Sequence, residues 1–261
     1  VNVFERFLNE FPSSKYADKV SDYLVDLYMT TRSYESALNS IARIDRPSSR
    51  ILEAKQKLLF QMGVQNFANS DFKQAIDYFS SALALGQYNA QTRADAAYWR
   101  GEAYYRLGDL DQAARNFRDY LSLTPKREGE TYALAHYNLG YIAFNKKNFD
   151  EAENWFSKYT QLETGDNRVA LADAFNRRGD AYLQNRAFIQ AKGNYTRALN
   201  TSAQVGDYSI YQLALVAGLQ KNYAEKVSLL SRLSNEYGES PYVAQGLYEK
   251  GRGYVQQQQS N

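Results

Sequence analysis

One hydrophobic pattern recurs along the chain. An aromatic residue or leucine is followed three positions later by alanine, and four positions after that by another aromatic residue. The pattern occurs in four segments, SDFKQAIDYF, GDLDQAARNF, KNFDEAENWF and RAFIQAKGNY, with alanines at Ala75, Ala113, Ala152 and Ala191. The alanines lie 38, 39 and 39 residues apart, and a glycine precedes each by 12 residues, at Gly63, Gly101, Gly140 and Gly179. Two positions with one period predict a helical repeat protein.

Each repeat reads as two helices. Between Gly101 and Ala113 the sequence predicts a helix, a break at Gly108-Asp109 and a second helix, with Asp109 near its N-cap. The small residues at both ends of this segment allow two antiparallel helices to approach closely where they cross. Thr124-Pro125 ends the pair, because proline does not continue a helix interior. One pair alone cannot bury its apolar faces, so stacked neighbours complete the core.

The pattern extends more weakly to both ends, at Ala37 and at Lys226, where lysine replaces alanine. The sequence therefore predicts an all-α superhelix of about 14 antiparallel helices, in six pairs plus one orphan helix at each end. Residues 1–255 are expected to form one solenoid domain, and 256–261 a polar tail. The expected repeats span 17–48, 55–88, 94–125, 132–165, 171–204 and 208–240, and the flanking helices 1–11 and 242–255. The opening within a helix predicts a fragment of a longer protein.

The repeats resemble the tetratricopeptide repeat family. Gly101, Tyr104, Ala113, Phe117 and Pro125 have the family's spacing, and the repeats on either side match at most of these positions. The family's usual period is about 34 residues, so the longer period here predicts helices or connections extended by about a turn. The joints NEFPSSKYA and NEYGESPYVA are similar to those of bacterial envelope repeat proteins, such as the Tol–Pal-associated coordinator and the outer-membrane assembly lipoprotein. This similarity favours the bacterial periplasm or envelope over the cytoplasm.

The resemblance implies that partners bind on the concave side, which the first helices line. The family's groove positions fall three before and one, four and five after the small glycine position. The partner-binding residues expected from them are Tyr98, Glu102, Tyr105, Arg106, Tyr137, Tyr141, Asn145, Asn176 and Asp180. Phe144, Leu183 and Gln184 occupy further groove positions, as do Asp22, Asp26, Met29, Phe60, Val64 and Phe67 in the first two repeats. A tyrosine-rich strip suits peptide recognition, although several of the 23 tyrosines are expected to pack between repeats.

The composition gives little support to an enzyme. The chain has no cysteine, and its single histidine, His136, lies where a packing residue is expected. No phosphate-binding glycine motif is present, and the segment LETGDNR lacks the alternating ligands of a calcium loop. We therefore expect no catalytic residue, metal site or cofactor. The net charge of +2 argues against nucleic-acid binding, and no apolar run reaches the roughly 20 residues of a membrane span.

Three functions remain open from the sequence. The first is a scaffold that binds a protein or peptide on the concave face. The second is a glycan-binding solenoid of the bacterial envelope, which the regular spacing disfavours because it leaves no room for inserted loops. The third is a sensor or tethering segment of a larger signalling protein, with self-association through the solenoid ends.

Overall fold

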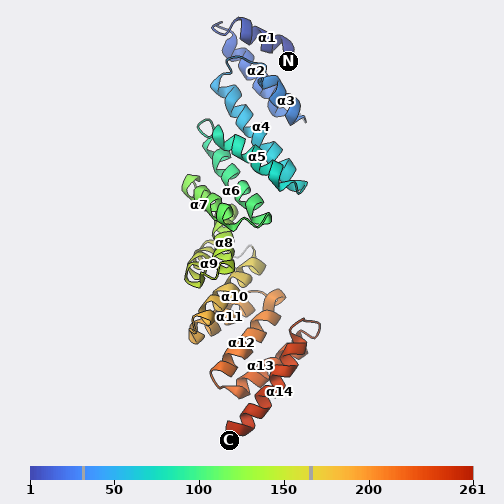
Figure 1. The fold of residues 1–261 in the computed structure, drawn as a ribbon, viewed down its shortest axis with the longest axis vertical. Helices are drawn as coiled ribbons and strands as arrows, with labels where there is room; N and C mark the ends of the chain where they lie inside the picture. Colours follow the sequence, from blue (N-terminus) through green and yellow to red (C-terminus); the bar gives the residue numbers. More distant parts are fainter. Residues whose placement is uncertain (31–32, 165–166, 261) are drawn as a thin grey trace. The chain divides into compact units, whose positions relative to one another are not determined.

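The computed structural model describes residues 1–30, 33–164 and 167–260, and the described chain contains 14 α-helices, one 3₁₀ helix and no strand (Figure 1). It divides into two compact units, residues 1–127 and 128–261. The first unit contains α1 (Asn2–Glu10), α2 (Ala17–Thr30), α3 (Tyr34–Ile41), α4 (Ser49–Ala68), α5 (Phe72–Ala84), α6 (Ala90–Arg106) and α7 (Leu110–Leu123). The second contains α8 (Glu130–Asn145), α9 (Phe149–Leu162), α10 (Arg168–Gln184), α11 (Phe188–Thr201), η1 (Ala203–Val205), α12 (Gly206–Leu219), α13 (Tyr223–Glu236) and α14 (Val243–Ser260). The predicted order of helix pairs with one further helix at each end is confirmed.

The break between the two helices of a pair has one repeated geometry. Gly108 lies in the left-handed region at φ 81°, and Asp109 caps α7 by accepting the Gln112 N–H at 3.1 Å, as predicted. In four other pairs the corresponding residue is not glycine: Ser70, Lys147, Arg186 and Lys221 have φ between 58° and 63°. Since L-residues are strained there, the fold requires this turn even where the side chain disfavours it.

The helix crossings explain the conserved spacing of glycine and alanine within this chain. A Cβ added to Gly63 would lie 2.5 Å from the ring of Phe79, and one added to Gly140 would lie 2.8 Å from the ring of Phe156. Gly101 and Gly179 meet the rings of Phe117 and Tyr195 in the same way. These four rings are fully buried. Each crossing therefore consists of a glycine on the first helix under a ring on the second.

First helices of successive pairs lie side by side. In the first unit α2 contacts α4 and α4 contacts α6, and in the second α10 contacts α12. The first helices α4, α6, α8 and α10 have 16 to 20 residues, whereas the second helices α5, α7, α9 and α11 have 13 or 14. The extra residues of the long period therefore lengthen mainly the first helices, and each unit has a face made by them. We call this surface the first-helix face.

The last crossing replaces alanine with a buried ion pair. Lys226 on α13 donates to Glu249 Oε2 on α14 at 2.6 Å, and both residues are buried. Burial alone would raise the pKa of Glu249, but Lys226 and Arg252 hold it below its ordinary value. Beyond this contact α14 continues to Ser260, through the residues expected to form a polar tail.

Candidate interaction face

In the first unit, the residues predicted to bind a partner differ in accessibility. Tyr98 is only 6% exposed, and its ring packs edge-on against Phe117 and Tyr120. The expected accessibility of Tyr98 is therefore corrected: its ring belongs to the core, because it fills the space beside the Gly101 crossing. Glu102 and Tyr105 are half-buried, and Arg106, the last residue of α6, is exposed.

In the second unit, two predicted tyrosines share one carboxylate. Tyr137 and Tyr141 lie one turn apart on α8, and their rings contact each other edge-on. The Tyr137 hydroxyl donates to Asp173 Oδ2 on α10 at 2.7 Å, and the Tyr141 hydroxyl donates to the same oxygen. Both side chains are half-buried. The two rings are therefore held in place while part of each remains accessible.

A second carboxylate extends this arrangement to α12. Asp180 accepts the hydroxyls of Tyr195 and Tyr208, each at 2.8 Å. Arg177 lies between the two carboxylates, with Nη1 2.6 Å from Asp180 Oδ2 and Nε 3.5 Å from Asp173 Oδ1. The Arg177 guanidinium also stacks on the rings of Tyr208 and Phe144. We call Tyr137, Tyr141, Phe144, Asp173, Arg177, Asp180 and Tyr208 the tyrosine–carboxylate strip.

Two further predicted residues are buried within this region. Asn176 is 1% exposed and accepts the Ser209 hydroxyl at 2.8 Å, and Asp180 is 7% exposed. The expectation that these side chains are open to a partner is therefore corrected, because both join α10 to its neighbours. Asn145, the last residue of α8, is exposed.

Several side chains of the strip have pKa values shifted from their ordinary values. Burial and the neighbouring Asp173 carboxylate raise the pKa values of Tyr137 and Tyr141, so both stay protonated and act as donors. Burial raises the pKa of Asp180, although Arg177 opposes this shift. Burial alone would lower the pKa of Arg177, but the carboxylates of Asp180 and Asp173 raise it. At neutral pH the arginine is therefore a fixed positive charge beside the two aspartates.

Sequence reasoning missed three members of the strip. Asp173 and Arg177 lie six and two residues before Gly179, and Tyr208 lies six before Ala214. These positions are outside the four groove positions taken from the family. Asp173 and Tyr208 occupy the same position in two successive repeats, and this repetition can be seen in the sequence. Their role is recognised from the hydrogen bonds that they make in the structure.

His136 has the packing role predicted for it. Its ring contacts those of Tyr132 and Trp155, and Nδ1 lies 2.8 Å from the Tyr132 carbonyl oxygen. The residue is buried, and burial lowers the pKa of its imidazole. A neutral histidine enclosed by rings supports helix packing and has no nucleophile beside it in these contacts.

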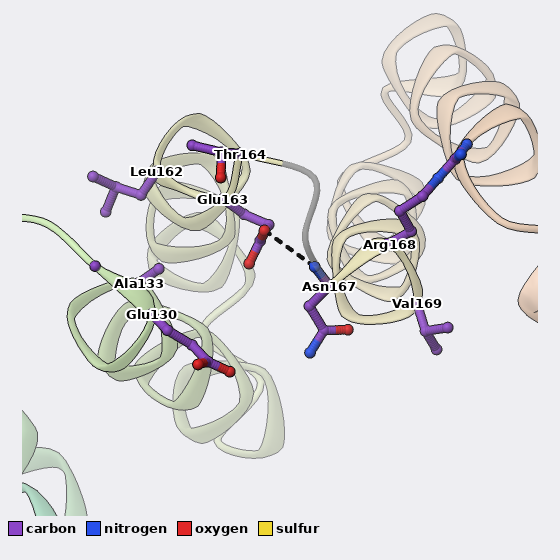
Figure 2. Close-up of a pocket in the computed structure, with 9 residues that line it drawn as sticks. Glu130, Ala133, Leu162, Glu163, Thr164, Asn167, Arg168 and Val169 are labelled. Carbon is purple, nitrogen blue, oxygen red and sulfur yellow. Dashed lines mark hydrogen bonds between the residues drawn. The ribbon is translucent and has the colours of Figure 1, made fainter.

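A cavity of about 580 Å³ with a mixed polar and apolar lining lies where α8 and α10 begin and α9 ends. Figure 2 shows Glu130, Glu163 and Asn167 around it, with Arg168 extending away. Glu163 Oε1 accepts the Asn167 N–H at 3.3 Å. Among the described residues no group of three or more potential ligands could hold a metal ion. The segment LETGDNR borders this cavity, and its Gly165 and Asp166 lie outside the described residues.

Two stretches of the sequence, residues 94–127 and 133–166, match the family model described as tetratricopeptide repeat. The protein contains tetratricopeptide repeats. The matched stretches coincide with the pairs α6–α7 and α8–α9. Tetratricopeptide repeat protein 6 from Homo sapiens is 27% identical over 119 residues, which are 46% of this chain and 20% of that protein. The aligned segment thus spans about a fifth of the length of this curated relative.

Solved structures have the same fold. The MamA protein aligns with a TM-score of 0.59 and 17% identity over 70% of this chain and 92% of its own. The pilF protein of Pseudomonas aeruginosa aligns with a TM-score of 0.51 and 18% identity over 89% of this chain and 99% of its own. A chain of the APC/C hetero-tetramer Cut9–Hcn1 aligns with a TM-score of 0.52 and 15% identity over 95% of this chain and 45% of its own. In the described part of this chain, every helix is too short or too polar to span a bilayer.

Proposed function

We propose that the protein is a non-enzymatic scaffold that binds a protein or peptide segment on the first-helix face of residues 128–261. The observation behind this proposal is the tyrosine–carboxylate strip. Its tyrosines present partly accessible rings whose hydroxyls are already bonded to Asp173 and Asp180. Rings held in this way lose little conformational entropy when a partner covers them, which favours recognition by contact area.

The chemistry of the strip supports binding rather than turnover. Arg177 lies between Asp173 and Asp180, so its positive charge is paired with carboxylates of the strip. The tyrosine hydroxyls have raised pKa values, which makes them poor nucleophiles at neutral pH. Tetratricopeptide repeats generally act as scaffolds for other proteins, and Cut9–Hcn1 is a hetero-tetramer in which a chain of this fold is assembled with protein partners.

A random peptide library displayed on phage tests the proposal. Peptides selected on the full chain are measured by calorimetry against three variants. Tyr141→Ala removes a ring of the strip, and Asn145→Ala shortens the exposed residue one turn further along α8. Tyr16→Ala is the matched control, because Tyr16 is an exposed tyrosine that precedes α2.

We expect Tyr141→Ala to weaken peptide binding at least about tenfold, as loss of an interface aromatic does. Tyr16→Ala should leave binding unchanged. Tyr141→Phe, which keeps the ring, provides a second measurement if the alanine variant unfolds. Peptides that bind all variants equally would place the binding surface elsewhere. Selection of no peptide, with binding on a glycan array, would support the glycan alternative instead.

A further inference from the structure

Asp95 is a half-buried carboxylate on α6, a first helix of the first unit (Figure 1). Its Oδ1 accepts a hydrogen bond from Gln91 Nε2 at 2.9 Å, one turn earlier on the same helix. Among the described residues it forms no ion pair, and burial raises the pKa of its carboxyl. Burial of a charge without a partner costs stability, and carboxylates in such surroundings are concentrated at functional sites.

The second unit shows which groups an aspartate at this position contacts. Asp173 accepts two tyrosine hydroxyls from α8, and its Oδ1 lies 3.5 Å from Nε of Arg177, four residues later on α10. The Arg177 guanidinium lies over the Phe144 ring of α8, 6.0 Å from its centre. Hydroxyl donors and a cation that lies on a ring therefore surround this carboxylate.

Apolar side chains occupy the equivalent positions of the first unit. Trp99 replaces the arginine, and its ring packs edge-on against Phe67, which corresponds to the ring under that arginine. Phe60 and Val64 replace the two tyrosines. All four side chains are half-buried and pack in one cluster, so part of each stays accessible. The hydroxyl donors and the cation that Asp173 contacts therefore have no counterpart at these positions of the first unit.

We propose that this surface of α4 and α6 binds a peptide segment of a partner protein through a lysine or arginine side chain. The cation pairs with the Asp95 carboxylate, and the aliphatic stem lies along Phe60 and Trp99. Charge complementarity specifies this occupant, because a carboxylate beside apolar side chains matches a cation on a hydrocarbon stem. A tryptophan ring also attracts a cation more strongly than other rings do. These residues all belong to the first unit, so the site does not depend on the tyrosine–carboxylate strip.

The charges on the neighbouring turns agree with a cationic ligand. Glu102 lies seven residues after Asp95, on the same side of α6, and corresponds to Asp180 of the second unit. Lys57 on α4 pairs with Glu53 at 2.7 Å, so its positive charge is already balanced by a carboxylate. The surface around Asp95 therefore favours a positive group over a negative one.

An array of random eight-residue peptides tests the proposal. Each peptide has lysine, arginine or glutamine at one fixed central position, and the unmodified chain and Asp95→Asn are applied in parallel. We expect a set of peptides whose signal falls at least tenfold on Asp95→Asn, and nearly all of this set should have a basic central residue. The absence of such a set, or a set as rich in glutamine as in lysine and arginine, would overturn the proposal.

Calorimetry with one peptide of this set separates the site from other surfaces. Asp77→Asn is the matched control, because it removes an exposed carboxylate of α5 in the same unit, and it should change the affinity less than twofold. Tyr141→Ala alters the strip of the second unit and should also leave the affinity unchanged. Peptides that respond to Tyr141→Ala and never to Asp95→Asn would support the proposed function and overturn this further site.

A charge exchange provides a measurement that does not rely on loss of binding. Asp95→Lys should reject the basic peptide and bind the same peptide with glutamate at its central position at least tenfold more tightly than the unmodified chain does. Helical circular dichroism checks that both Asp95 variants are folded, and Asp95→Asn should melt no lower than the unmodified chain. A folded Asp95→Lys that still prefers the basic peptide would contradict the proposed ion pair.

Discussion

Asp95 and Asp173 occupy the same place in two repeats but have different surroundings. Each lies six residues before its first-helix glycine, Gly101 or Gly179. Asp173 accepts hydrogen bonds from Tyr137 and Tyr141, which lie on the preceding first helix, α8. Their counterparts in the first unit are Phe60 and Val64, which pack in the same apolar cluster as Ala96 and Trp99.

The difference shows how one scaffold can place either a core or a polar network at the same position. Asp173 accepts two tyrosine hydroxyls and lies 3.5 Å from Arg177. Asp95 accepts a hydrogen bond from Gln91 on its own helix at 2.9 Å, and burial raises its pKa. A carboxylate therefore joins neighbouring helices only where the preceding helix supplies hydroxyl donors.

The largest expected contrast comes from removing each carboxylate. Asp173→Ala leaves the hydroxyls of Tyr137 and Tyr141 without their acceptor and removes the carboxylate that lies 3.5 Å from Arg177. It should lower the free energy of unfolding by about 2–3 kcal/mol. Asp95→Ala should change it by less than about 0.5 kcal/mol, because it removes a charge that burial already disfavours. Denaturant midpoints, with hydrogen exchange to locate the loss, measure both. Equal losses would show that the tyrosine network adds no stability.

The glycine crossings should respond alike in the two units. Gly63→Ala and Gly140→Ala each force a methyl group into a buried ring and should destabilise the fold by about 1–3 kcal/mol. Gly193→Ala, in an open helical position, should instead stabilise it by about 0.5–1 kcal/mol. Thermal unfolding compares the three variants. A neutral effect at either crossing would mean that this ring can move aside.

Exchanging a hydroxyl between the units tests the comparison more finely. Tyr137→Phe should lower the free energy of unfolding by about 1 kcal/mol, the usual contribution of one hydrogen bond. Phe60→Tyr should place a donor in the corresponding position of the first unit and lower the pKa of Asp95. Titration of the Asp95 carboxyl by NMR reports this change. An unchanged pKa in a folded variant would show that the two helices are not spaced as in the second unit.

The smallest expected effect is the pH dependence due to Asp95. Its pKa is raised in the folded state, so above an ordinary aspartate pKa of about 3.9 the folded chain holds this proton more tightly than the unfolded chain. The contribution of Asp95 to stability is therefore present at low pH and is lost as the pH rises through the folded pKa. Asp95→Asn should raise the melting temperature slightly at pH 7 and have a smaller effect near pH 4. The opposite order would contradict a raised pKa.

Much of the architecture was predictable, because the residues responsible lie close together in sequence. The spacing of Gly101, Ala113 and Phe117 defines one helix crossing, and its period locates the others. The Asp109 cap follows from a local rule that needs no tertiary information. The extra length of the repeat was predicted, but its place was not. α4 begins at Ser49, whereas the expected repeat began at residue 55.

The candidate face was predictable only in part. The family's groove positions placed Tyr137, Tyr141 and Asn145 on this face. Tyr137 and Tyr141 are half-buried, and Asn145 is exposed. Tyr98 has the register of Tyr137, and its ring packs on Phe117 and Tyr120 as that of Tyr137 packs on Phe156 and Tyr159, yet Tyr98 is buried and Tyr137 is half-buried. Register states which side of a helix a residue occupies, whereas burial depends on the side chains of the neighbouring helices.

The sequence by itself determined the helix pairs, their order and their crossings, because glycine, alanine and ring positions act within one repeat. Only the tertiary structure decided what the polar residues do. Asp173 meets Tyr137 and Tyr141 from another repeat, and Lys226 is buried because Glu249 on the next helix neutralises it. These partners lie 23 to 36 residues apart, and no local pattern distinguishes them from exposed charges. Close packing between stacked helices brings them together and excludes the water that would otherwise separate them.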